Sequence, residues 1–451
     1  MNTKANLFSD PSNGRRSLSA VVGQILEQAR LEGASTAEAA VSVGQGLSVT
    51  VRLGEVETVE HNRDKQLALT VFFGQKSGSA STSDFSDAAI RDTVRAACSI
   101  AKYTAEDECA GLADPDRLAK TILDLDLYHP WTPGTSGAIE IARQCEDAAR
   151  RVDPRIKNSE GATLSTNEGL QVYGNTHGFV GAIPTTRHGL SCSVIAEDDE
   201  GMQRDYWYST TRDCADLETP EAVGGKAGRR AIRRLGARKL DTRQTPVIYE
   251  APIASSLLSH FVGAVRGASL YRSASFLIDH IGRKVFADHV RIHEQPHLKK
   301  ALGSASFDSE GVGTAARDIV TDGVLQGYVL DSYSARKLGL QTTGNAGGVH
   351  NLTITPGEHD LEGLLHYMDT GLLITELIGF GVNIVTGDYS RGAAGFWIEG
   401  GKIQFPVEEI TVAGNLKQMF TDLAAVGNDV DTRGNIRNGS LLISNVTVAG
   451  S

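Results

Sequence analysis

The spacing of apolar residues changes along the first hundred positions from a helical period to a strand-like one. Between residues 17 and 32, Leu18, Val22 and Ile25 recur every three or four positions, which predicts an amphipathic helix. From Gly46 onward apolar and polar residues alternate, and a second strand-like run covers residues 67–73. A second helix is predicted to start near Ser86. The first unit therefore consists of a helix, antiparallel strands and a helix.

A similar order follows an irregular, Asp- and Pro-rich connection at residues 107–134. Apolar positions at helical intervals predict a helix through Cys145, and glycine-punctuated alternating segments follow at residues 158–208. Thr219 supplies an N-cap oxygen and Pro220 suits the first helical position, which predicts a helix running toward Leu235. The recurrence suggests two related modules, as an internal duplication would produce.

Beyond residue 240 glycine is denser and the apolar runs are short. These runs are residues 246–249, 324–330, 372–377 and 403–407. Strands of this length between turns are typical of an antiparallel β domain. We therefore predict an α+β protein with an N-terminal domain of helices and antiparallel strands at residues 1–240, and a glycine-rich antiparallel β domain at residues 241–451.

Composition narrows the classes of function. The net charge of −11 argues against a protein whose main task is binding nucleic acid. One stretch, Lys226–Arg243, is strongly basic; a solvated helix face or a subunit contact is favoured over a nucleic-acid patch, because no aromatic residues interleave to stack bases. The five cysteines form no CxxC pair, which argues against a disulfide framework or a cysteine zinc site.

Location follows from the absence of targeting patterns in the sequence. Residues 1–16 are polar and lack the apolar core of a secretory signal. No later segment approaches the ~20 apolar residues of a membrane span. We expect a cytoplasmic protein.

One string resembles a zinc-peptidase motif. His293, Glu294 and His297 match H-E-x-x-H, which places two imidazoles one helical turn apart. Pro296 lies between them, and proline inside a helix lacks an N–H and clashes with the preceding turn. A loop entering a helix at Pro296 is therefore favoured, and a metal site of another shape is the alternative. Neither a Gly-x-Ser-x-Gly elbow nor a phosphate-binding glycine loop occurs in the sequence.

The run from Gly387 to Glu399 combines small residues with aromatic ones. Such a segment lets another backbone approach closely and is a candidate for strand addition by an extended peptide. A tight hairpin that packs on the core is the more common reason for this composition. The candidate groove residues are Tyr389, Ser390, Arg391, Gly392, Ala393, Gly395 and Phe396.

Several longer motifs, in order, resemble the TldD/PmbA peptidase family over nearly the whole chain. They are Ser306–Gly311, Ser334–Gly339, Thr343–Gly348, the Gly387–Glu399 run, Phe405–Val407 and Thr411–Leu416. In that family the TldD subunit is a zinc peptidase with a His-Glu-x-x-x-His helix. The resemblance implies that residues 241–451 are equivalent to the TldD peptidase domain.

The zinc motif of TldD is degenerate at the matching positions. With Tyr271-Arg272 as the landmark, Ser259 and Ala264 stand where TldD has its zinc histidines, and His260 stands where it has the general-base glutamate. TldD also uses a cysteine near the C-terminus as a ligand, whereas no cysteine follows Cys214 here. The chain therefore resembles the PmbA/TldE branch, which implies no catalytic residue and no metal in this chain, with zinc expected in a TldD-like partner.

The resemblance implies a subunit of a TldD–TldE metalloprotease complex that cleaves unfolded or extended peptides, maturing a microcin-type precursor and degrading an antitoxin. Its expected partners are a TldD-like zinc peptidase subunit and extended peptides, with a homodimer as an option for the isolated chain. The alternative is a regulatory binding protein acting on DNA gyrase or nucleic acid. An independent metalloprotease using His293 and His297 is a third option.

Overall fold

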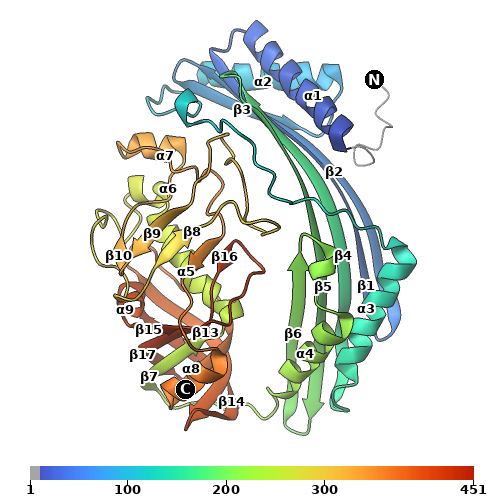
Figure 1. Cartoon of the computed structure of the whole chain (residues 1–451), viewed down its shortest axis with the longest axis vertical. Coiled ribbons are helices and arrows are strands. Elements are labelled where there is room, and N and C mark those ends of the chain that lie inside the picture. The colour runs from blue at the N-terminus through green and yellow to red at the C-terminus, as the bar shows by residue number, and fades with distance from the viewer. Residues whose placement is uncertain (1–10, 451) are drawn as a thin grey trace.

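The computed structural model describes residues 11–450 and consists of a long curved sheet that arches over a C-terminal β domain (Figure 1). Residues 1–10, which are most of the polar N-terminal stretch considered above, and Ser451 lie outside the described residues. The mixed architecture confirms the predicted α+β class. None of the helices within the described range is long and apolar enough to span a membrane.

The curved sheet has six antiparallel strands in the order β3-β2-β1-β4-β5-β6. The strands are β1 (Thr36–Arg52), β2 (Glu55–Phe73), β3 (Lys76–Thr82), β4 (Ile156–Asn175), β5 (Val180–Asp198) and β6 (Gly201–Thr211). Strands β1 and β4 pair at the centre, from Glu38 opposite Asn175 to Val51 opposite Ala162. The sheet order is therefore symmetric about this pair.

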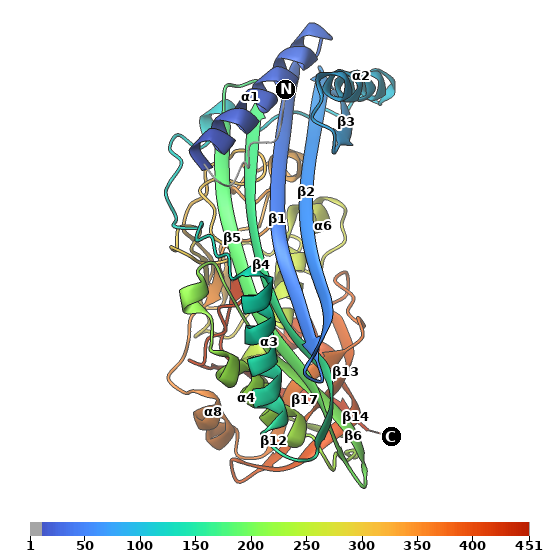
Figure 2. The same cartoon turned by 90° about the vertical axis from the view of Figure 1, so that its right-hand side faces the viewer.

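Two pairs of helices cover the outer face of this sheet (Figure 2). They are α1 (Pro11–Leu31) and α2 (Asp87–Tyr103) over one half, and α3 (Gly134–Arg150) and α4 (Pro220–Ile232) over the other. Each half thus runs helix, three strands, helix, as the sequence suggested. The N-cap predicted at Thr219 and the helix start predicted near Ser86 are confirmed, since both side chains accept hydrogen bonds, from Ala222 N and Ala89 N.

The alternation along β1 decides which side chains meet the helices. Val41 packs with α1 and α2 in one core cluster, and Val49 packs with α3 and α4 in a second. Strand β1 begins at Thr36, ten residues before the predicted start. Its first half begins with Thr-Ala-Glu-Ala-Ala, and the weak contrast between these apolar and polar side chains concealed the period.

The C-terminal domain contains a six-stranded sheet in the order β14-β13-β12-β7-β17-β15, in which β14 also pairs with β17. This extra pairing closes five of its strands into a small barrel. The strands are β7 (Arg243–Tyr249), β12 (Gly371–Ile378), β13 (Asp388–Glu399), β14 (Lys402–Asn415), β15 (Leu423–Val426) and β17 (Leu441–Ala449). Most neighbours are antiparallel, but β7 and β12 are parallel.

A smaller five-stranded sheet and several short helices complete this domain. The sheet has the order β10-β9-β8-β11-β16. Its strands are β8 (Ile292–Glu294), β9 (Arg317–Thr321), β10 (Val324–Leu325), β11 (Leu352–Ile354) and β16 (Ile436–Arg437). The helices are α5 (Ala251–Val265), α6 (Gly267–Tyr271), α7 (Ser332–Lys337), α8 (Leu361–Met368) and α9 (Leu416–Thr421).

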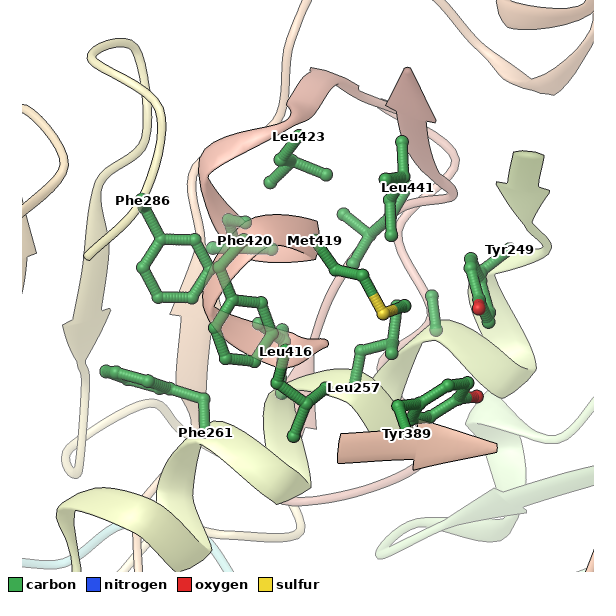
Figure 3. Packing of buried hydrophobic residues seen from close by; sticks show 14 of the residues in the cluster. Tyr249, Leu257, Phe261, Phe286, Tyr389, Leu416, Met419, Phe420, Leu423 and Leu441 are labelled. Carbon is green, nitrogen blue, oxygen red and sulfur yellow. The ribbon is translucent and has the colours of Figure 1, made fainter. Parts of the chain in front are cut away.

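Helix α5 runs through the core of the C-terminal domain (Figure 3). Phe261 on α5 makes an edge-to-face contact with Phe286, which stacks on Phe420 of α9. Leu257 and Phe261 are almost completely buried in this cluster. The helix is therefore rigidly held, which positions the polar side chains on its other faces.

The basic stretch Lys226–Arg243 lies at the junction of the N-terminal and C-terminal domains. Several of its side chains form ion pairs or ring contacts with other residues of the same chain. Arg230 is buried between Asp205 of β6 and Glu250, at distances of 3.1 and 2.9 Å. Arg234 pairs with Glu376, and Arg243 lies over the Trp397 ring. Arg230 and Arg234 thus depart from the expected solvated helix face, because they neutralise carboxylates contributed by both domains, whereas Arg229 on the same helix is exposed.

The connection between α2 and α3 forms a strap along the C-terminal domain (Figure 1). Arg336 of α7 donates to the carbonyls of Cys109, Gly111 and Leu112 and to the Asp114 carboxylate. Arg336 belongs to the Ser334–Gly339 motif noted in the sequence. The motif therefore holds the strap in place.

A second interdomain contact brings three carboxyl groups together. Glu310, on a loop of the C-terminal domain beside Asp308, approaches Glu38 of β1, whose carboxylate accepts from Tyr173 Oη at 2.8 Å. Burial raises the pKa of all three groups, and that of Asp308 reaches about 7 although three backbone N–H groups donate to it. Asp308 is therefore expected to be protonated below neutral pH.

This contact predicts that stability falls as pH rises from about 4 to 7. In that window native Asp308 retains a proton that the unfolded chain, with its ordinary value of 3.8, has released. The resulting loss of unfolding free energy is at most about 4 kcal/mol. Urea midpoints at pH 5 and pH 8 measure it. Asp308→Asn should reduce the difference between the two midpoints, whereas Asp64→Asn, at an exposed position, should leave it unchanged; equal reductions in both variants would contradict the assignment.

Candidate functional site

Helix α5 carries the three positions matched to the zinc motif, and they do not converge. Ser259 is exposed, with its hydroxyl donating to the Ser255 carbonyl at 2.9 Å, whereas Ala264 is fully buried in the core. Residues five apart on an α-helix are rotated by about 140° from each other. The two positions therefore face different environments: the Ser259 hydroxyl lies at the surface, and Ala264 is in the core and has no lone pair to offer a metal.

His260 lies half-buried against an aromatic ring. Its ring meets that of Tyr389 edge to face, with centroids 6.1 Å apart. Burial, and then the positive charge of Arg391, lower the pKa of His260 below its usual range. Its Nε2 atom is buried and has no hydrogen-bond partner within the described part of the chain.

The contact between His260 and Tyr389 brings together two sets of candidate residues that lie 129 positions apart in the sequence. Tyr389, Ala393, Gly395 and Phe396 are buried, Arg391 and Gly392 are half-buried and Ser390 is exposed. Strand β13 pairs with β12 on one side and β14 on the other, so it has no free edge at which a peptide could add. This segment packs as a core strand. A peptide could therefore contact it only through its side chains.

Gly395 owes its presence to strand packing. A Cβ atom at this position would lie 1.8 Å from the Leu373 carbonyl oxygen of β12. The register between β12 and β13 shifts at this point, which brings the backbones close. The glycine therefore serves a contact between neighbouring strands.

A pocket of about 400 Å³ opens beside α5, between the two domains. Its walls come from β6, the turn after α4, the first half of α5, and strands β12 and β13. The lining residues are Arg204, Asp205, Tyr206, Arg234, Pro252, Ile253, Ser255, Ser256, Thr375, Glu376, Leu377 and Arg391. Of these, only Arg391 and Arg234 drew attention in the sequence, because the others come together through long-range contacts.

The H-E-x-x-H string forms no metal site. His293 and Glu294 lie on strand β8, and no helix starts at Pro296, so the expected helix is wrong while the exclusion of a helical zinc motif holds. Glu294 is buried and accepts from Arg317, Asn345 and the His350 backbone at 2.8–2.9 Å. His297 contacts Thr314 Oγ1 at 3.0 Å. These groups stabilise the loop structure of the small sheet.

A zinc ion does not fit the residues present. Within residues 11–450 no group of three or more His, Cys, Asp or Glu side chains is arranged to hold a metal. Around α5 the imidazole of His260 faces a tyrosine and an arginine, and a guanidinium repels a cation. No step of a reaction can therefore be assigned to a metal held by α5.

Three family models cover most of the chain. Domain 1, the central domain and the C-terminal domain of the PmbA/TldA metallopeptidases match residues 37–101, 128–235 and 242–450. The first two models correspond to the two halves of the curved sheet, and the third to the barrel domain. The chain belongs to the PmbA/TldD metallopeptidase family.

Within the family its similarity is to PmbA. The chain is 50% identical to metalloprotease PmbA of Escherichia coli O157:H7 over 92% of both chains. A Bacteroides thetaiotaomicron structure described as a modulator of DNA gyrase is 29% identical with a TM-score of 0.91, covering 96% of this chain and 99% of that one. TldE from Thermococcus kodakarensis has the same fold, with a TM-score of 0.83, 18% identity and coverage of 95% and 100%.

Proposed function

We propose that this chain is the non-catalytic subunit of a peptidase complex whose zinc belongs to a TldD-like partner. The observation that carries the proposal is the state of α5, where Ser259 and Ala264 occupy the matched ligand positions and His260 packs against Tyr389 and Arg391. In this proposal the chain contributes to substrate binding and to the shape of the complex, and the partner performs hydrolysis in the cytoplasm.

The proposed substrates are extended or unfolded peptides, including a microcin-type precursor and an antitoxin. The inner face of the curved sheet supports this class of substrate because it is polar and built partly of small residues. Asn62 and Asn167 flank Gly46 there, and Gln66 and Gln171 flank Ser42. Polar side chains beside glycine offer hydrogen bonds to a peptide backbone without selecting particular side chains.

The test compares the purified chain alone, a TldD-like subunit alone and the two together. We expect co-elution of the two chains, zinc stoichiometric with the TldD-like subunit only, and peptidase activity that requires that subunit. Strong chelator-sensitive peptidase activity from this chain alone would overturn the proposal, as would a failure of the two chains to associate.

Restoring the motif residues is expected not to create a zinc enzyme. In a Ser259→His, His260→Glu, Ala264→His variant the third side chain would enter a fully packed core position, so the two histidines would not reach one ion. We expect less than 0.1 zinc per chain by elemental analysis and no peptidase activity, an order-of-magnitude threshold for a site that lacks its ligand geometry. Stoichiometric zinc in this variant would show that α5 rearranges readily. The single variant Ser259→His serves as the folding control, because Ser259 is exposed.

A regulatory role at DNA gyrase or on nucleic acid has weaker support. Its local basis was the basic stretch Lys226–Arg243, whose Arg230 and Arg234 are engaged with carboxylates of the same chain. Salt-dependent binding of DNA by the isolated chain would favour this role.

A further inference from the structure

Arg391 is an uncompensated cation in the wall of the pocket beside α5. The other two pocket arginines are paired, Arg204 with Glu160 at 3.2 Å and Arg234 with Glu376. No side chain of residues 11–450 forms an ion pair or hydrogen bond with the Arg391 guanidinium, and its Nε is buried. The desolvated Nε therefore lacks the hydrogen bond that a buried donor normally makes, while the half-buried guanidinium can meet a counter-charge that enters the pocket.

A neutral donor lies on the same pocket wall. Thr375 is only 5% exposed, and its Oγ1 has no partner within the described residues. It stands where the register of β12 shifts between Ile374 and Glu376, so the bulge turns its side chain out of the strand ladder. Bulges of this kind are common beside binding sites because they redirect one side chain.

The charge balance of the pocket selects the ligand class. Asp205 and Glu376 also line it, and although both are paired with arginines they disfavour a dianion such as a phosphate monoester. A single carboxylate matches one free guanidinium, which can hold it through two parallel N–H bonds. The remaining walls, formed by Pro252, Ile253 and Leu377, are apolar. A carboxylate attached to a small apolar group therefore fits both parts of the pocket.

We propose that this pocket binds the C-terminal carboxylate of an extended peptide, with Arg391 as its anchor, Thr375 as a hydroxyl donor and an apolar terminal side chain packed on Pro252 and Ile253. A volume of 400 Å³ lies in the range of about 300–1,000 Å³ typical of small-ligand sites and accommodates the terminal residues of a peptide. The proposal deepens the proposed function, on which it rests for the source of the peptide, while the binding itself requires only this chain.

Calorimetric titration of the full isolated chain with N-acetyl-Ala-Ala-Leu and with its C-terminal amide tests the proposal. We expect the free acid to bind at least about tenfold more tightly than the amide, since the amide cannot accept the two guanidinium bonds. Equal affinities for acid and amide, or no binding of either at millimolar concentration, would overturn it. Acetate and inorganic phosphate are titrated in parallel; either ion binding as tightly as the peptide acid would overturn recognition of a peptide.

Two variants and a matched control locate the site. Arg391→Gln should reduce the affinity for the acid to that for the amide, and Thr375→Val, which keeps the side-chain shape, should weaken it by about threefold to tenfold. Arg229→Gln, at an exposed arginine of α4 that does not line the pocket, should bind as the wild type does. Binding by Arg391→Gln equal to wild type would refute the assignment of the anchor. Thermal unfolding of each variant verifies its fold. If Arg391→Gln does not fold, the affinity of Thr375→Val for the acid decides whether the ligand binds in this pocket.

The binding test uses this chain alone, so its outcome does not depend on a TldD-like partner. A chain that associates with a TldD-like subunit but does not distinguish acid from amide would refute the pocket assignment alone. A chain that binds the acid through Arg391 but does not associate with such a subunit would refute the proposed function alone.

Discussion

Arg230→Met is expected to lower the free energy of unfolding by about 3 kcal/mol. Removing one member of a buried ion pair leaves the other member without compensation, which typically costs about 3–5 kcal/mol. Arg230 lies between Asp205 and Glu250, and both carboxylates are buried. The lower end of the range applies because Arg233 and Arg234 remain within 3.5 and 3.8 Å of the two acids.

Comparing the urea denaturation of Arg230→Met with that of Arg229→Met isolates the contribution of the buried ion pairs. Arg229 is the preceding residue on α4 and is exposed, so its replacement removes the same charge without exposing a buried acid. We expect a change within about 0.5 kcal/mol for the control. Equal changes in the two variants would mean that the junction between the domains does not depend on the buried pair.

Gly395→Ala is the second substitution with a large expected effect, a loss of about 3 kcal/mol. A methyl group at this position would lie 1.8 Å from a backbone carbonyl of β12, so β12 and β13 must move apart at the centre of the barrel. Overpacking of a well-filled core typically costs about 1–3 kcal/mol, and backbone cannot yield as a flexible side chain does. The loss is measured as a shift of the urea midpoint.

Gly169→Ala on β4 is the matched control. Its nearest neighbours would be 3.6 and 3.7 Å from the new methyl group, an ordinary van der Waals distance. Alanine should leave the free energy of unfolding unchanged or raise it slightly, because it reduces the conformational entropy of the unfolded chain. A Gly395→Ala variant as stable as this control would revive the interpretation that the glycine serves a ligand.

Local signals in the sequence predicted the helices well and the strand pairing only in part. The N-caps at Ser86 and Thr219 are short-range features that a sequence displays directly. The closure of the barrel depends on β14 meeting β17, in which paired residues such as Thr411 and Ala449 lie more than thirty positions apart, and no local period encodes it. Pro296 was expected to start a helix but instead follows strand β8, because the tertiary contacts of Glu294 prevail over local preference.

Some residues of the candidate site could be singled out from the sequence, but their assembly into a pocket could not. Ser259, His260 and Ala264 were singled out by family resemblance, and Arg391 by its glycine-rich neighbourhood. Nothing local marked Thr375, whose importance comes from a β-bulge, or Asp205, which enters the pocket from the other domain. Pockets between domains are assembled from residues that lie far apart in the sequence. The balance of charged side chains in such a pocket can therefore be judged only from the structure.

The central pairing of β1 with β4 has a consequence for synthesis on the ribosome. More than a hundred residues separate the two strands, so β1 emerges with one long edge unpaired until β4 has been made. An alternating apolar edge strand in a nascent chain is prone to pair with other chains. We therefore expect chaperones to contact nascent chains whose synthesis has reached a point between residues 103 and 175. Ribosome-bound chains of these lengths should aggregate more readily than longer ones.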